Sequence, residues 1–193
     1  MLNILFVCTG NTCRSPMAEG LLRKLSAERG IELGVRSAGV SAITGTSMSR
    51  HAAAILREEG FEGSITSSQL TEEMVNWADL ILTLTRSHKQ HVLHYYPEAV
   101  DKTYTLKEYT GSEESVRADL AELDSLYAQA ELKRSLGQEP NAGDMERIIE
   151  IRQRIPSFDI TDPYGGTRED YEMAAAEIRS ALHRLLDKLD VPR

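Results

Sequence analysis

Cysteine is scarce in this chain of 193 residues, and its two cysteines, Cys8 and Cys13, lie close together. Two cysteines cannot supply a disulfide framework, so we expect the protein to work in the reducing cytoplasm. Apolar runs long enough to span a membrane are also missing from the sequence. The first residues lack the basic region and the cleavage signal that direct secretion. The formal net charge of −8 disfavours binding to nucleic acid or to anionic membranes.

Internal repeats and low-complexity tracts are absent as well, and the length fits one domain spanning residues 1–193. Short apolar runs alternate with segments of helical spacing, which predicts a parallel sheet covered by helices on both faces. The predicted strands are residues 4–7, 34–39, 79–84 and 103–106. The predicted helices are one that opens with Pro16 and closes at Gly30, and others capped by Ser49, Thr71, Ser87 and Thr167.

A loop of small polar residues, reading CTGNTCRS from Cys8 to Ser15, connects the first predicted strand to the first helix. Backbone N–H groups and the helix dipole favour an anion at such a helix N-terminus. A cysteine in this place would have its thiolate stabilised and become a nucleophile near neutral pH. Arg14 adds a planar cation that suits the oxygens of a phosphate. The sequence therefore predicts a phosphate-binding loop with a nucleophile at its base.

Other interpretations of these residues are weaker. A strand-end cysteine is often a small buried hydrophobe, but a buried Arg14 would be costly without an anionic partner. A nucleotide-binding P-loop needs a second Gly and a Lys, and this loop has neither. Of the histidines spread over the predicted helices, His91 and His94 are close together but have no carboxylates or thiols nearby. We therefore interpret His91 and His94 as surface residues, and we expect no metal site and no cofactor.

The N-terminal run CTGNTCRSPMAEG resembles the low-molecular-weight protein tyrosine phosphatase family, and within it most resembles the bacterial protein arginine phosphatases. The similarity covers nearly the whole chain except about 113–158, through motifs at 36–39, 78–82, 105–109 and 162–166. It implies a three-layer α/β sandwich with a four-stranded parallel sheet flanked by helices. It also implies an enzyme that removes phosphate from phosphoarginine residues of proteins through a phosphocysteine intermediate.

The same resemblance implies roles for individual residues. Cys8 corresponds to the nucleophile and Arg14 to the group that holds the phosphate oxygens. Asp162, in an Asp-Pro-aromatic motif, corresponds to the proton donor for the leaving group. Asp159 and Asp170 lie nearby, and we interpret them as helix caps or solvated charges. The expected phosphate- and substrate-binding residues are Thr9, Gly10, Asn11, Thr12, Cys13, Ser15 and Tyr164.

Three of these residues keep two interpretations. Ser15 can hydrogen-bond the thiolate and lower its pKa, or it can cap the helix. Tyr164 can form an aromatic wall at the site or serve in packing. Cys13 can form a reversible disulfide with Cys8, as its family counterpart does, or fill space beneath the loop, and the two roles are compatible.

Thr12 indicates the subclass, because tyrosine phosphatases of the family usually carry an apolar residue there and the arginine phosphatases carry Thr. A hydroxyl beside the scissile bond reduces the fit to an apolar phenyl ring. A protein tyrosine phosphatase remains the second candidate. An arsenate reductase would need cysteines beyond Cys13, and a non-catalytic phosphoprotein-binding module would lack the nucleophile or the acid. Phosphorylated proteins are the expected partners, and the oligomeric state stays open.

Two further features concern the scaffold of the site. Ile65 stands where many family members have a His that supports the Asn of the loop, so either a nearby Ser replaces it or the loop is less rigid. Residues 113–158 carry two apolar helical faces separated by turn-forming residues 137–143, which predicts an inserted helical hairpin. A tolerated surface insertion and a substrate-gating role both fit this hairpin.

Overall fold

The computed structural model describes residues 1–111 and 114–190. The chain divides into two compact units, one made of residues 1–111 and 158–193 and the other of residues 112–157. Within the described part of the chain, no helix combines the length and the apolar character needed to cross a membrane.

Four parallel strands form the sheet of the larger unit, in the order β2-β1-β3-β4. They are β1 (Leu2–Cys8), β2 (Leu33–Gly39), β3 (Leu80–Thr83) and β4 (Thr103–Thr105). The register aligns Cys8 of β1 with Gly39 of β2, and Val7 with Thr83 of β3. The carboxyl ends of the central strands therefore meet at one edge, which is where parallel sheets bind ligands. The predicted four-stranded parallel sheet is confirmed.

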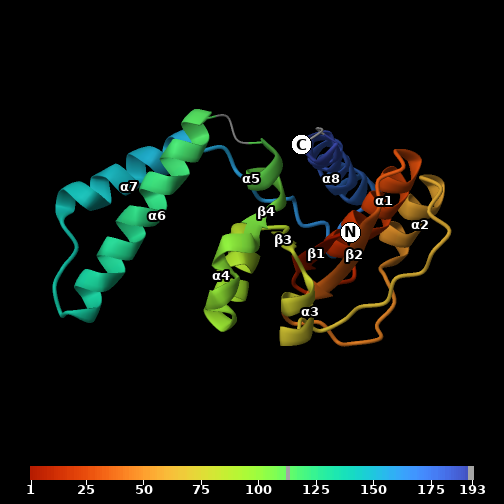
Figure 1. Cartoon of the computed structure of the whole chain (residues 1–193), viewed down its shortest axis with the longest axis horizontal. Helices are drawn as coiled ribbons and strands as arrows, with labels where there is room; N and C mark the ends of the chain where they lie inside the picture. The colour runs from red at the N-terminus through yellow and green to blue at the C-terminus, as the bar shows by residue number, and fades with distance from the viewer. Residues whose placement is uncertain (112–113, 191–193) are drawn as a thin grey trace. The chain divides into compact units, whose positions relative to one another are not determined.

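Helices cover both faces of this sheet (Figure 1). One core contains Ile4 and Phe6 of β1 and is covered by α1 (Arg14–Glu28), α2 (Arg50–Glu58), α5 (Leu106–Gly111) and α8 (Arg168–Leu189). The other core contains Leu5 and Val7 and is covered by α3 (Glu72–Trp77), α4 (Arg86–Tyr95) and the 3₁₀ helix η1 (Pro97–Lys102). Successive strand residues point to opposite faces, so β1 is apolar at every inner position.

Most helix starts follow the sequence signals, with two differences. The predicted N-caps that the structure confirms are Ser49, Thr71 and Thr167. The cap of α4 is Thr85 rather than Ser87, because the chain is still extended at Thr85 and its Oγ1 accepts a hydrogen bond from the N–H of His88 at 3.2 Å. Helix α1 begins at Arg14, so Pro16 is its third residue. Its missing N–H still lies in the first turn, where no helical bond is lost.

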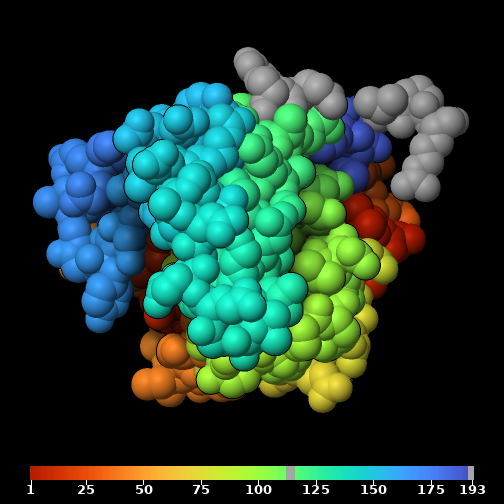
Figure 2. Space-filling model, turned by 90° about the vertical axis from the view of Figure 1, so that its left-hand side faces the viewer, coloured from red at the N-terminus to blue at the C-terminus, as the bar shows by residue number. Residues whose placement is uncertain are grey.

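The smaller unit is a helical hairpin of α6 (Glu114–Ser135) and α7 (Ala142–Arg154), which lie side by side in the space-filling view (Figure 2). Its chain reverses after α6 at Gly137, which has a positive φ of 69°. Two helices are present where the sequence predicts them. The apolar seam between them is thin, with Leu123, Ile148 and Ile151 buried.

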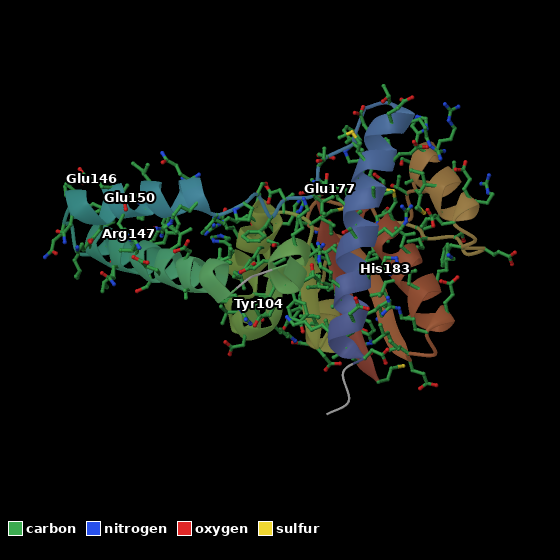
Figure 3. The ribbon with its side chains drawn as sticks, turned by 90° about the horizontal axis from the view of Figure 1, so that it is seen from above. Tyr104, Glu146, Arg147, Glu150, Glu177 and His183 are labelled. Atoms are coloured by element: carbon green, nitrogen blue, oxygen red, sulfur yellow. The ribbon has the colours of Figure 1, made fainter. Side chains whose placement is uncertain are left out.

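Ion pairs also join the two helices of the hairpin. Arg147 makes a two-pronged contact with Glu122, with N–O distances of 2.6 and 2.9 Å. Its NH1 contacts Glu150 at 3.1 Å on the same helix, and Figure 3 shows Arg147 and Glu150 on α7. Further pairs between α6 and α7 are Arg154–Asp119 at 2.7 Å and Lys133–Asp144 at 3.0 Å. Charged side chains thus supplement a small core.

Candidate active site

The loop after β1 is shaped by the neighbouring strand as well as by its own sequence. The N–H groups of Val40 and Ser41 donate to the carbonyls of Cys8 and Thr9, each at 2.9 Å. A Cβ atom on Gly39 would lie 2.4 Å from the carbonyl oxygen of Thr9. Glycine is therefore required at position 39, because any side chain would push the end of β2 away from the loop.

Asn11 is the internal support of the loop, and its backbone is left-handed with a φ of 54°. Its fully buried side chain donates through Nδ2 to the hydroxyls of Ser15 and Ser37, both at 2.8 Å. Its Oδ1 accepts from the N–H of Ser68 at 2.8 Å. Serines thus provide the support for Asn11 that Ile65 cannot. Of the two alternatives for Ile65, the structure shows replacement of the His by serines.

The Ser37 hydroxyl continues this network to a buried carboxylate. Ser37 donates to Glu19 Oε2 at 2.5 Å, and Glu19 is paired with Arg23 at 2.5 Å. Burial raises the pKa of Glu19, against the lowering by the Ser37 hydrogen bond and by the charge of Arg23. The network ties the loop to the middle of α1, and it was not visible in the sequence because its members are far apart in the chain.

Cys8 lies at the base of the loop and is almost completely buried. Its Sγ is 2.8 Å from the hydroxyl oxygen of Ser15. Burial raises the pKa of the Cys8 thiol, and hydrogen bonds from Ser15 and the N–H of Asn11, together with the charge of Arg14, act in the lowering direction. The groups that the sequence predicted to stabilise the thiolate thus act in the expected direction, and burial at the end of β1 opposes them.

Ser15 itself contacts Cys8 and does not cap α1. The N-cap position is Cys13, and no side chain caps this helix. Of the two interpretations of Ser15, the structure shows the hydrogen bond to sulfur. The first turn of α1 can therefore offer its N–H groups to an anion.

Arg14 connects the loop to the segment that carries Asp162. Its NH1 donates to the carbonyl of Ile160 at 3.1 Å, and its NH2 lies 3.2 Å from Asp162 Oδ2. The Arg14 side chain is buried, whereas that of Asp162 is 56% exposed. The structure thus places a buried cation between the cysteine loop and a solvent-accessible carboxylate, although the two segments are nearly 150 residues apart in sequence.

The remaining residues of the acid segment have clear structural positions. Tyr164 is 80% exposed, which excludes the packing interpretation, and its N–H donates to Asp162 Oδ1 at 3.2 Å. Asp159 Oδ1 accepts from the N–H of Arg86, the first residue of α4. Asp170 forms a capping box with Thr167 at the start of α8. The two rival carboxylates are engaged at helix starts, as the sequence suggested.

Thr12 and Cys13 differ in exposure, although Thr12 Oγ1 lies 3.6 Å from Cys13 Sγ. Thr12 is half-buried, as is Gly10, and Thr9 is exposed, so these three border the solvent side. Cys13 is buried, with its Sγ 3.2 Å from the hydroxyl of Tyr171 on α8. Both cysteines are free thiols. Burial is the largest cause that raises the pKa of Tyr171, followed by the Cys13 hydrogen bond, so the phenol is neutral.

His88 is a site neighbour that sequence reasoning missed. Its ring is buried, with Nε2 2.8 Å from Thr9 Oγ1 and Nδ1 2.9 Å from Thr85 Oγ1. Burial and the charge of Arg14 lower the pKa of His88 to about 4, so it is neutral at pH 7. The sequence signal for His88 is Thr85, three residues earlier, because it caps α4. A cap at Ser87 instead gives His88 no such partner.

The charges of this site suit an anion. Among the residues that the structure describes, no three His, Cys, Asp or Glu side chains group as metal ligands would. The loop instead combines the N–H groups of Asn11 and Ser15 with the cation of Arg14 around one sulfur. Such a set can bind a phosphoryl group and stabilise the charge that develops on it.

Comparisons with known proteins agree with this arrangement. The model of the family described as low molecular weight phosphotyrosine protein phosphatase matches residues 3–133. A protein-arginine-phosphatase of Geobacillus stearothermophilus is 36% identical over 186 residues, which are 96% of this chain and 95% of that protein. Low molecular weight protein-tyrosine phosphatase A of Mycobacterium tuberculosis is 31% identical over 192 residues, which are 98% of this chain and 92% of that protein.

A solved structure shows the same fold. It is a YwlE arginine phosphatase in a Cys-to-Ser mutant with a phosphorylated active-site serine. The TM-score is 0.73 at 31% identity, covering 100% of this chain and 98% of that chain. The chain belongs to the low molecular weight phosphotyrosine protein phosphatase family.

Proposed function

We propose that the protein removes phosphate from phosphoarginine residues of proteins through a phosphocysteine intermediate. The observation that carries this proposal is the Arg14 contact, which unites the cysteine loop with the carboxylate of Asp162. Nucleophile, cation and proton donor are then side by side, as phosphoryl transfer from a protein substrate requires. The phosphorylated serine in the YwlE mutant supports a covalent step at this position.

The chemistry begins at Cys8. Its thiolate attacks phosphorus, the bond from phosphorus to the guanidine nitrogen breaks, and Asp162 gives that nitrogen a proton. Arg14 and the N–H groups of the loop, from Thr9 to Ser15, hold the other phosphate oxygens. The Ser15 hydroxyl stabilises the thiolate both before attack and when it leaves again.

The second step releases phosphate. The Asp162 carboxylate, now deprotonated, takes a proton from a water molecule that attacks phosphorus and breaks the S–P bond. Its 56% exposed side chain gives water a route to this carboxylate. Tyr164, which follows at the rim, offers an aromatic surface to the arriving side chain.

The preference for phosphoarginine rests on Thr12 and on the relatives. Thr12 lies at the half-open side of the loop, where a hydroxyl can contact a guanidinium. The Geobacillus relative is a protein-arginine-phosphatase across nearly the full length. A tyrosine phosphatase is the alternative, which the Mycobacterium relative represents. The two cysteines are free thiols, and we place the activity in the cytoplasm, with phosphorylated proteins as partners.

The test compares hydrolysis of phosphoarginine and phosphotyrosine peptides by the wild-type protein and by Thr12→Ile. We expect the wild type to prefer phosphoarginine. Thr12→Ile removes a hydrogen bond that contributes about 1.5–3 kcal/mol, so the ratio of kcat/KM values should shift about ten- to hundredfold towards phosphotyrosine. A wild-type preference for phosphotyrosine would refute the subclass, and an unchanged ratio would refute the role of Thr12.

The matched control is Cys8→Ser. It should bind vanadate as the wild type does and turn over neither peptide, because a hydroxyl is a much weaker nucleophile than a thiolate and a phosphoserine, once formed, is not readily hydrolysed. Appreciable turnover by Cys8→Ser would assign the nucleophile elsewhere.

A protective disulfide between Cys8 and Cys13 is a further part of this proposal. Both thiols lie at the same loop, and Cys13 is held by Tyr171 beneath it. After mild peroxide, the wild type should regain activity with a thiol reductant, whereas Cys13→Ser should stay inactive. Equal recovery of both proteins would leave Cys13 a packing residue.

A further inference from the structure

The segment that precedes Asp162 is attached to the body of the fold at successive residues. The N–H of Ile160 donates to the carbonyl of Leu84 at 2.8 Å, just after β3. Asp159 Oδ1 accepts from the N–H of Arg86 at 2.8 Å. These bonds fix the segment on its β3 side.

An ion pair between two helices attaches the other side of the same segment. Lys107 of α5 and Glu177 of α8 are in direct contact. Lys107 Nζ also donates to the carbonyl of Asp159 at 3.0 Å, and Glu177 Oε1 accepts from the hydroxyl of Thr161 at 2.6 Å. Figure 3 shows Glu177 on α8. Each member of the pair thus holds one residue of the segment, on either side of Ile160.

A simpler role for the pair would be to join α5 to α8. A plain interhelical ion pair does not need to bond a third segment, however, and here both charged groups do so. Each side chain is only about a quarter exposed, at 24% for Lys107 and 26% for Glu177. Partial burial makes such charge-assisted bonds stronger and better defined than those on an open surface.

The position of Asp162 depends on this backbone. Asp162 follows Thr161 directly, and its own side chain is 56% exposed with contacts to Arg14 and to the N–H of Tyr164. A general acid must lie within hydrogen-bond reach of the atom that it protonates. A displacement of about 1 Å can cost on the order of 10²-fold in rate.

We propose that Lys107 and Glu177 are positioning residues that hold the 159–161 segment so that Asp162 can deliver its proton to the leaving group. In the step concerned, the S–P bond forms, the bond from phosphorus to the leaving atom breaks, and the carboxyl proton of Asp162 goes to that atom. The inference rests on the proposed role of Asp162. It gives a function to Lys107, which lies in one of the sequence motifs outside the loop.

The test uses leaving groups of different basicity. p-Nitrophenyl phosphate has a good leaving group that needs little proton donation, and phenyl phosphate has a poor one. We expect Lys107→Met to lower kcat/KM for phenyl phosphate about 10- to 100-fold and for p-nitrophenyl phosphate less than about threefold. Inhibition by inorganic phosphate should be unchanged, because the cysteine loop is intact.

Three variants make the comparison decisive. Lys107→Arg should restore most of the rate on phenyl phosphate, since a cation remains. Thr161→Val keeps the ion pair and removes only its bond to the segment, so it should show a smaller effect of the same kind and decides the matter if Lys107→Met does not fold. Asp187→Asn breaks the ion pair between Arg29, at the end of α1, and Asp187 of α8, which does not contact the segment. It should change the rate on neither substrate.

The outcomes separate the two proposals. The positioning role is refuted if the rate of Asp162→Asn depends strongly on the leaving group while Lys107→Met lowers kcat/KM equally for both substrates or for neither. Asp162 then remains the general acid. If Asp162→Asn itself shows no such dependence, the acid assignment fails and the positioning role falls with it.

Discussion

The cysteine loop and the helical hairpin achieve order in opposite ways. Residues 9–13 of the loop have no regular structure, yet the residues after β2, the segment around Ser68 and α4 all bond to the loop. The hairpin is almost entirely helical, yet its shared core holds Leu123, Ile148 and Ile151 with ion pairs at its sides. Tertiary contacts determine the conformation of the loop, whereas local helix formation and a thin apolar seam determine the structure of the hairpin.

This difference has a consequence for substitutions. A change at a loop contact disturbs hydrogen bonds that join several segments of the fold, so it should lower both the catalytic rate and the global stability. A change in the hairpin removes part of a small, separate seam, so it should loosen the hairpin alone.

The largest effect is expected from Gly39→Ala, with Gly137→Ala as its counterpart in the hairpin. A Cβ at Gly39 meets the carbonyl of Thr9 at 2.4 Å, a backbone atom that cannot turn aside. The loop must move, so we expect activity to fall by roughly 10²-fold or more, with lower thermal stability. Gly137 has a positive φ of 69° but open space around it, so its substitution should cost only about 1 kcal/mol in the hairpin.

Peptide hydrolysis and thermal unfolding of both variants check this contrast. Near-normal activity of Gly39→Ala would mean that the loop tolerates displacement and that its many contacts are not needed for its shape. A loss of activity in Gly137→Ala would instead connect the hairpin to catalysis.

The second prediction concerns Ile151→Ala in the hairpin. Ile151 is fully buried in a cluster of three, so its truncation should destabilise the hairpin by about 2–5 kcal/mol. Hydrogen exchange should show faster exchange in α6 and α7, with unchanged exchange in β1 and β3. Hydrolysis of small aryl phosphates should be unaffected. A changed rate on peptides alone would favour the substrate-gating interpretation over a tolerated insertion.

Sequence patterns predicted the parts of the fold that depend on local chemistry. The apolar run of β1 and the helix caps at Ser49, Thr71 and Thr167 were correct, because strand burial and capping act within a few residues. The predicted cap of α4, Ser87, was wrong. Ser87 and Thr85 can both accept the capping hydrogen bond, and the position where β3 ends decides between them.

The site was predictable where a residue type suffices, and not where the surroundings decide. The family resemblance of the Cys–Arg loop and of the Asp-Pro-aromatic motif assigned Arg14 and Asp162 to one site, and their side chains lie 3.2 Å apart. The sequence indicated the groups that favour the Cys8 thiolate but not the burial that opposes them, because burial depends on enclosure by the core. His88 and Glu19 were missed because their contacts with Thr9 and Ser37 join distant parts of the chain.

The smallest effect is expected at His88, and it appears only in acid. Burial and the charge of Arg14 lower the pKa of His88 from 6.5 to about 4, so the native state binds fewer protons than the unfolded chain between these values. Neutral His88 therefore gives its full contribution above about pH 6.5, and the contribution is lost as the pH falls towards 4. The shift corresponds to about 1–3 kcal/mol at most, after allowance for partial solvation.

His88→Gln keeps a donor and an acceptor for Thr9 and Thr85 but cannot titrate. Urea unfolding at pH 7 and pH 4.5 should show that the wild type loses more stability than His88→Gln. Equal losses would mean that His88 is protonated without cost, and that the bonds from its ring to the loop and to Thr85 are not maintained in solution.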